Sequence, residues 1–100
     1  MKNTPFEHKK MLNFIGKRFT GSRVTIGKHR ERSLLIASAL YNRFGVHIYQ
    51  YQQKHFLWLL TEYVKNYTGG TQYNYYLTVI KLIELEPKFF IWKKCLSLTR

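Results

Sequence analysis

Apolar residues recur three and four positions apart in several segments of this chain, and short breaks separate those segments. Such spacing places apolar side chains on one face of an α-helix, whereas a half-buried strand needs strict alternation. The breaks are Thr20-Gly21-Ser22, Gly45 and Tyr67-Thr68-Gly69-Gly70. A chain of 100 residues has the length of one domain. The pattern therefore predicts an all-α fold, a compact bundle of four to five helices.

The first helix has a start signal near the N-terminus. Thr4 can cap it, Pro5 suits the first helical position, and Glu7 can complete a capping box. Its apolar stripe is expected to be Leu12, Ile15 and Phe19. We expect this helix to end near Phe19, because the break at residues 20–22 follows.

The second helix is predicted to be the longest. Ser22 or Thr25 can cap it, and it should run to Phe44, with Gly45 in the position that follows a helix end. Residues 46–51 alternate weakly and predict a short extended connection. The expected apolar face comprises Leu34, Ile36, Ala37, Leu40, Tyr41 and Phe44.

Two further helices are expected before Pro87. Residues 52–66 should form the third, and Thr71 should cap a fourth over residues 72–84. The expected inward residues are Phe56, Leu59, Leu60, Tyr63 and Val64 in the third, and Tyr76, Leu77, Ile80 and Ile83 in the fourth. Residues 88–98 are expected to form a fifth short helix or a docked tail. The predicted organisation is thus a helical domain over 1–86 and a C-terminal piece over 87–100.

The charge of the chain points to a polyanionic partner. Seventeen Lys and Arg stand against five Glu, which gives a net charge of +12, whereas a magnitude of roughly 2–8 is common for a small domain. Residues 1–50 hold ten Lys or Arg and two Glu, and residues 51–100 hold seven and three. DNA, RNA or an acidic membrane surface would compensate such an excess. The alternative is a basic surface that is merely solvated.

No catalytic or metal-binding pattern is present in the sequence. Cys95 is the only cysteine, so no internal disulfide can form, which suggests a reducing compartment. The four scattered His match no metal-ligand spacing, and no Gly-rich phosphate loop is present. We expect no enzyme activity, no cofactor and no metal. Without a signal peptide or a long apolar run, we expect a cytoplasmic protein, or one inside the host cell if it is viral.

The strongest candidate for nucleic-acid contact is the basic segment, defined here as residues Lys17–Arg32. Its positive side chains and hydroxyls suit phosphate groups, which contribute affinity and register rather than sequence readout. Positive charge at the start of a helix opposes the helix dipole, and a bound phosphate would compensate it. The candidate residues are Lys17, Arg18, Ser22, Arg23, Thr25, Lys28 and Arg32.

The start of the fourth helix is a second candidate. Thr71, Gln72 and Asn74 stand among three tyrosines there, and Gln and Asn can bind adenine edges. The alternative is that Thr71 only caps the helix, that Tyr73 and Tyr76 belong to the core, and that Gln72 and Asn74 are solvated. Lys54 and His55, at the start of the third helix, are either phosphate contacts or solvated residues.

The order of these features resembles the N-terminal, SAM-like core-binding domain of phage integrases, the tyrosine recombinases. The likeness covers roughly residues 11–86 and rests on Gly21-Ser22-x-x-Thr25, Arg30 or Arg32, Leu34…Leu40…Phe44-Gly45-Val46, Gln53-Lys54-His55 and Thr71-x-Tyr73-Asn74. In that family a bundle of four or five helices forms one half of a clamp around the recombination site. The resemblance implies that the second and fourth helices grip double-stranded DNA, with the basic segment on its backbone and with homo-oligomers on DNA as an option.

The resemblance does not imply recombination by this chain. In the family, catalysis belongs to a separate downstream domain with an Arg, a His-x-x-Arg motif and a Tyr nucleophile. His29-Arg30-Glu31-Arg32 matches that motif by spacing, but it lies within the region that resembles the core-binding domain, so we interpret the match as coincidence. The chain is then expected to be either an integrase fragment or a stand-alone DNA-gripping module.

Two other functions stay open on the sequence. One is a small helical interaction or adaptor protein of a mobile element or virus, whose charge serves an acidic protein partner. The other, less expected, is a peripheral membrane protein that inserts aromatic residues beside lysines. Its contact residues would be Phe89, Phe90 and Trp92 with Lys88, Lys93 and Lys94.

Overall fold

A computed structural model describes residues 4–86 and residue 89 of the chain, and every regular element in this part is helical. The predicted all-α class is confirmed. Contacts group the residues into two units, Met1–Tyr51 (unit 1) and Gln52–Arg100 (unit 2). The predicted domain over 1–86 spans both units. The predicted fifth helix and the C-terminal piece lie outside the described residues, apart from Phe89.

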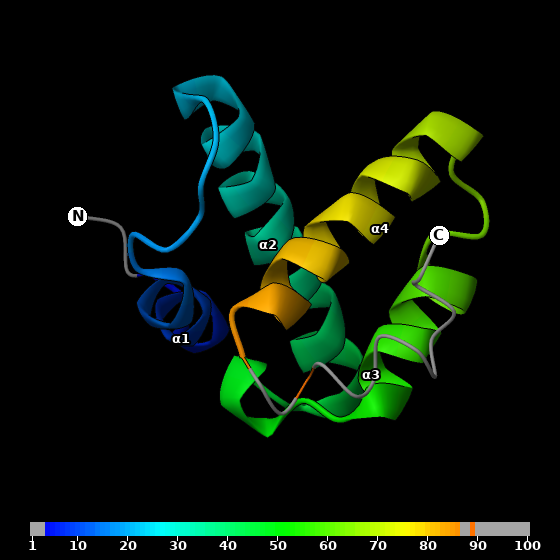
Figure 1. Ribbon diagram of the computed structural model, residues 1–100. Helices are drawn as coiled ribbons and strands as arrows, with labels where there is room; N and C mark the ends of the chain where they lie inside the picture. Colours follow the sequence, from blue (N-terminus) through cyan, green and yellow to red (C-terminus); the bar gives the residue numbers. More distant parts are fainter. Residues whose placement is uncertain (1–3, 87–88, 90–100) are drawn as a thin grey trace. The chain divides into compact units, whose positions relative to one another are not determined.

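Unit 1 is built on two helices and one short turn of 3₁₀-helix. These are α1 (Phe6–Ile15), α2 (Arg23–Phe44) and η1 (Ile48–Gln50), and α1 packs against both α2 and η1. Figure 1 shows α1 joined to the start of α2 by the extended loop of residues 16–22. The core of the unit is apolar, with Met11, Phe14 and Ile15 from α1, Ile36, Ala37 and Leu40 from α2, and Ile48 from η1.

The predicted bounds of α1 are wrong at both ends. The helix begins at Phe6, with Pro5 rather than Thr4 at the cap position. It ends at Ile15, because Gly16 takes a φ of 51° and donates its N–H to the Leu12 carbonyl at 2.9 Å. A positive φ is easy for glycine and interrupts the helical hydrogen-bond pattern. The prediction attributed the helix end to residues 20–22 and overlooked this glycine.

The early end of α1 changes which apolar residues are buried. Phe19 is buried as predicted, but it reaches the core from the loop rather than from the helix. Leu12 was expected on the inner face and is 37% exposed. Met11 and Phe14, one position before and two after it, are buried instead, so the true inner face of α1 is rotated from the predicted one.

The ends of α2 confirm the sequence interpretation. Ser22 is the cap, and its Oγ accepts a hydrogen bond from the Thr25 N–H at 3.1 Å. Gly45 follows the last turn in the left-handed conformation, with φ 70°. Within the helix the predicted face is confirmed at Ile36, Ala37 and Leu40, whereas Tyr41 is 39% exposed.

The extended connection predicted for residues 46–51 is interrupted in its middle. His47 and Tyr51 are extended, but Ile48–Gln50 between them form η1, which buries Ile48 completely. The His47 Nδ1 accepts from the Tyr49 N–H at 3.2 Å, and the Gln50 Oε1 accepts from the His47 N–H at 3.2 Å. These two side chains satisfy the backbone donors at the start of the turn, which favours it over an extended segment.

Unit 2 contains α3 (Gln53–Trp58), which continues into the π-helical turn η2 (Leu59–Tyr63), and then α4 (Gly69–Glu84). The third helix predicted over 52–66 corresponds to α3 and η2 together, although nothing in the sequence predicted the wider π turn. Phe56, Leu59 and Val64 are buried as expected. Phe89 is also buried, and its ring meets Phe56 edge to face at 5.6 Å between centroids.

The predicted start and inner face of α4 both need correction. The helix begins at Gly69, and the cap is Thr68 rather than Thr71, because the Thr68 Oγ1 accepts from the Thr71 N–H at 3.3 Å. Of the predicted stripe only Ile83 is fully buried; Tyr76, Leu77 and Ile80 are partly exposed. The residues that α4 buries are Tyr75, Thr78, Val79, Leu82 and Ile83. Apolar residues stand on several sides of this helix, so periodicity alone did not define its orientation.

Gly27, inside α2, and Gly45, which follows its last turn, provide a matched test of the fold. An added Cβ at Gly27 meets nothing within 4 Å, and Gly27 has an ordinary helical backbone. We expect Gly27→Ala to raise the free energy of unfolding by about 0.5–1 kcal/mol. Gly45→Ala should lower it by about 1–2 kcal/mol, because alanine is strained at φ 70°. Urea unfolding followed by circular dichroism measures both, and equal effects would contradict the α2 end described above.

Candidate nucleic-acid interface

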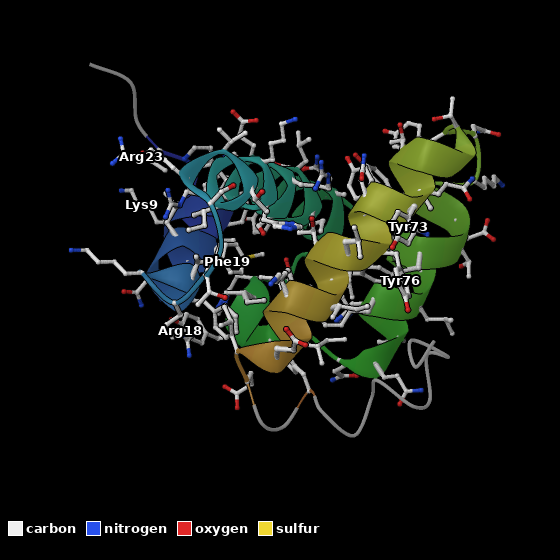
Figure 2. All side chains as sticks on the ribbon, turned by 45° about the horizontal axis from the view of Figure 1, so that its top comes forward. Lys9, Arg18, Phe19, Arg23, Tyr73 and Tyr76 are labelled. Carbon is white, nitrogen blue, oxygen red and sulfur yellow. The ribbon has the colours of Figure 1, made fainter. Side chains whose placement is uncertain are left out.

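Positive side chains gather on α1, on the loop that follows it and on the start of α2. In Figure 2, Lys9, Arg18 and Arg23 project outward on the same side of unit 1, whereas Phe19 points inward. Lys9, Lys17, Arg23 and Lys28 are exposed. No carboxylate among the described residues forms an ion pair with any of these four. Their charges are therefore available to an external anion.

Lys9 was not among the predicted contacts. It lies in α1, outside the basic segment, and no sequence pattern around it indicated a role in binding. Its neighbour Lys10 lies over the Phe6 ring, with Nζ 5.3 Å from the ring centroid. Because α1 ends at Gly16, Arg18 lies in the loop after it, and Lys9 and Arg18 project from the same side of unit 1. Helical spacing in the sequence does not predict that these two side chains share a side.

Arg18 is held by the end of α1. Its guanidinium donates to the Phe14 carbonyl and lies over the Phe14 ring, 4.8 Å from the centroid. Its backbone N–H also donates to the Ile15 carbonyl at 3.0 Å. A cation at this position suits the negative end of the helix dipole and satisfies carbonyls that the helix leaves unpaired. Arg18 thus stabilises the end of α1 from an exposed position.

Ser22 and Thr25 form the cap of α2. Besides accepting from the Thr25 N–H, the Ser22 Oγ donates to the Thr25 Oγ1 at 2.9 Å. Both residues are exposed. Their hydroxyls are engaged with each other, so the structure accounts for both residues by capping, and a phosphate contact is not needed to explain them.

The start of α2 is electrostatically unfavourable for the isolated protein. Arg23 is the first residue of the helix, and its first turn contains no acid. Lys28 follows in the second turn and shares a face with Arg32, one turn further on; Arg32 is partly buried. The helix dipole is positive at this end, so the Arg23 charge in the first turn raises the energy of the folded state unless an anion approaches.

The two predicted contacts in α3 differ in position. Lys54 is exposed, but His55 is 3% exposed and lies in the core of unit 2. The His55 Nδ1 accepts a hydrogen bond from the Gln52 N–H at 2.8 Å, so the imidazole caps α3. Burial lowers the pKa of His55, and the neighbouring Lys54 charge lowers the pKa further. A buried, neutral imidazole is not placed to bind phosphate, and we leave His55 out of the interface.

The three predicted contacts in α4 differ in whether their side chains already form hydrogen bonds within the protein. The Gln72 Nε2 donates to the carbonyls of Val64 and Tyr67, both at 3.0 Å, and so joins the turn after η2 to the start of α4. Thr71 shares a hydrogen bond with Thr68 between their hydroxyls at 3.1 Å. Asn74 is exposed on the outer surface of the helix. Of the three, Asn74 alone has a side chain that no described hydrogen bond engages.

Tyr73 and Tyr76 are not core residues, which corrects the alternative interpretation of this helix. Tyr73 is 58% exposed, and its ring stacks on that of Tyr76 with 6.0 Å between centroids and 22° between planes. Tyr75, between them, is the buried one. A stacked tyrosine pair at the surface was not predicted, because the orientation of α4 was assigned incorrectly.

The described residues contain neither a metal-binding cluster nor a membrane-spanning helix. Nowhere in residues 4–86 do three His, Cys or carboxylate side chains come together in a way that could hold a metal ion. Within the same part of the chain, no helix has the length and apolar character needed to cross a membrane. No protein family, curated protein or solved structure matches the chain.

The two capping histidines make stability depend on pH. Both His47 and His55 accept a backbone hydrogen bond on Nδ1, which requires the neutral ring. Burial lowers the pKa of His47, and the Lys10 charge lowers the pKa further. Because the folded-state pKa values are lowered, the unfolded chain binds protons first as the pH falls. The stabilisation is therefore complete above the ordinary pKa of about 6.5 and is lost below it.

We expect the free energy of unfolding to fall as the pH is lowered from about 7.5 to about 5. The fall should be shallower in His55→Gln, because glutamine at the third helical position also accepts the N–H of the cap residue but does not titrate. Urea unfolding at several pH values tests this. A variant whose stability follows the same pH profile as the original protein would show that His55 is not a source of the dependence.

Proposed function

We propose that this protein binds DNA by electrostatic contact between phosphates and the basic surface of unit 1. That surface is defined as Lys9, Lys17, Arg18, Arg23 and Lys28. The observation that carries the proposal is that four of these cations, Lys9, Lys17, Arg23 and Lys28, are exposed and form no ion pair with a carboxylate of the described residues. Phosphate neutralisation and counterion release make such surfaces bind nucleic acid with a strong salt dependence.

The position of Arg23 supports an anionic ligand rather than a merely solvated surface. A cation in the first turn of a helix lowers stability, and no acid in that turn offsets it. Phosphate at the same place would interact favourably with both the side chain and the helix dipole. The resemblance of residues 11–86 to integrase core-binding domains favours duplex DNA as the form of nucleic acid.

An acidic protein is the second candidate partner, because it would also compensate the net charge of +12. DNA and an acidic protein differ in how their negative charges are arranged: the phosphates of DNA repeat regularly, whereas the carboxylates of a protein do not. DNA offers a uniform array of phosphates to any protein with suitable cations, and so binding to random-sequence duplex is expected. An adaptor for an acidic protein has no need to bind random duplex with appreciable affinity.

The first test is a titration of random-sequence duplex DNA by fluorescence anisotropy at several salt concentrations. We expect Arg23→Ala with Lys28→Ala to weaken binding and to reduce the salt slope by roughly one unit per lost phosphate contact. Lys65→Ala with Lys81→Ala is the control, since it removes the same charge from unit 2. Equal losses in both double variants would mean that net charge, rather than this surface, determines binding.

Reversing one charge separates ligand binding from stability. Arg23→Glu places an acid in the first turn of α2, which should raise the free energy of unfolding by about 0.3–1 kcal/mol. The same change should weaken duplex binding, because it adds repulsion to the loss of one phosphate contact. Thermal unfolding and anisotropy titration measure the two effects. A variant that is both less stable and unchanged in binding would contradict this account of Arg23.

A further inference from the structure

Unit 2 contains a pocket that the basic surface does not include. It lies between η2 and the first half of α4 and has a volume of about 350 Å³, near the lower end of the range for small-molecule sites. Leu60 lines it from η2, and Gly69, Gln72, Tyr73 and Tyr76 line it from α4. Figure 2 shows both tyrosines on the side of α4 that faces the helix of residues 53–63.

The walls of this pocket suit a flat aromatic ring. Tyr73 and Tyr76 stack nearly parallel, and Tyr73 still exposes 58% of its surface. Gly69 has no side chain, and an added Cβ there would meet nothing within 4 Å, so the space beside the helix start is open. Aromatic faces next to open space bind planar groups by stacking, without a requirement for one particular base.

The pocket also has a group that can accept a hydrogen bond. The Gln72 Nε2 donates to the Val64 and Tyr67 carbonyls, which determines the orientation of the amide. Its Oε1 is consequently the end of this side chain that can take a further hydrogen bond. The exocyclic amines of adenine and cytosine are donors of the kind that such an oxygen accepts.

Three tyrosine rings cluster in unit 2, one from η2, one from the turn after it and one from α4. Tyr63, Tyr67 and Tyr75 have ring centroids 5.8–5.9 Å apart. Burial raises the pKa of Tyr63, and the neighbouring Tyr67 and Tyr75 raise the pKa further. No phenolate therefore forms at Tyr63 to repel a nucleic-acid strand.

We propose that this pocket holds an unpaired nucleobase of a bound nucleic acid. The inference rests on the proposed function, because the basic surface of unit 1 supplies the affinity for the backbone. A base inside a duplex has both faces covered by its neighbours, so the pocket can take one only from a single strand, an end or a distorted site. The protein then prefers nucleic acid with accessible bases over fully paired DNA.

The test compares strands that differ only in their bases. A single-stranded oligonucleotide of about 12 nucleotides is titrated beside an abasic strand of equal length, which keeps every phosphate. We expect the original protein to bind the base-bearing strand roughly 5- to 150-fold more tightly, which corresponds to stacking on one base. In Tyr73→Ala this preference should disappear, while binding of the abasic strand and of duplex DNA stays unchanged.

Two control variants make the result specific to the pocket. Tyr73→Phe keeps the aromatic ring and should keep the preference for bases. Tyr41→Ala removes a tyrosine that is 39% exposed on α2 and does not line the pocket, so it should leave the preference for bases unchanged. Tyr73 is exposed, so we expect each variant to fold, which circular dichroism confirms before titration.

The failures of the two proposals are distinguishable. Equal affinity of the original protein for base-bearing and abasic strands overturns the nucleobase pocket and leaves the phosphate surface intact. A base preference that survives in Tyr73→Ala also overturns the pocket. Absence of binding to any of the strands or to duplex at low salt overturns the DNA-binding function, and the pocket proposal with it.

Discussion

Side-chain hydrogen bonds hold the starts of α2, η1, α3 and α4, and several other features of the described structure depend on where these segments begin. The first N–H groups and last carbonyls of a helix have no partner within it. Here Ser22, His47, His55 and Thr68 supply acceptors at the starts of helical segments. Arg18 supplies donors at the end of α1. Because α1 has ten residues and α3 has six, neither would be stable in isolation, so packing of their buried residues stabilises them together with these end contacts.

The same helix limits position the charged residues. Since α1 ends at Gly16, Lys17 and Arg18 belong to a loop rather than to a helix face. Since α2 starts at Arg23, that cation stands where the helix dipole is least favourable to it. The capping hydrogen bonds of Ser22 stabilise the start of α2 in spite of this charge. An unfavourable cation at this position is explained if its attraction of an anion matters more for function than the stability that it costs.

The two units divide the proposed recognition into separate kinds of contact. The basic surface of unit 1 offers charge to phosphates, which gives affinity without sequence readout. The pocket of unit 2 offers stacked tyrosines and an amide oxygen to a base. The two kinds of contact use residues of different units, so substitutions in one unit test phosphate binding and substitutions in the other test base binding. Of the candidates from sequence, Ser22 caps α2, His55 caps α3, and Thr71 shares a hydrogen bond with the hydroxyl of Thr68, the cap of α4.

The sequence by itself determined the helical class, a start of α2 capped by Ser22 or Thr25, its end at Gly45, and the concentration of charge between Lys17 and Arg32. These follow from local spacing, backbone preference and composition, which need no knowledge of distant contacts. Only the tertiary structure decided that α1 ends at Gly16, that His55 is buried, and that Tyr73 is exposed while Tyr75 is buried. In α4 apolar and aromatic residues stand on several sides of the helix, so more than one orientation satisfies the spacing. The side that is buried depends on which residues of η2 and the following turn pack against it, and that choice is made by non-local contacts.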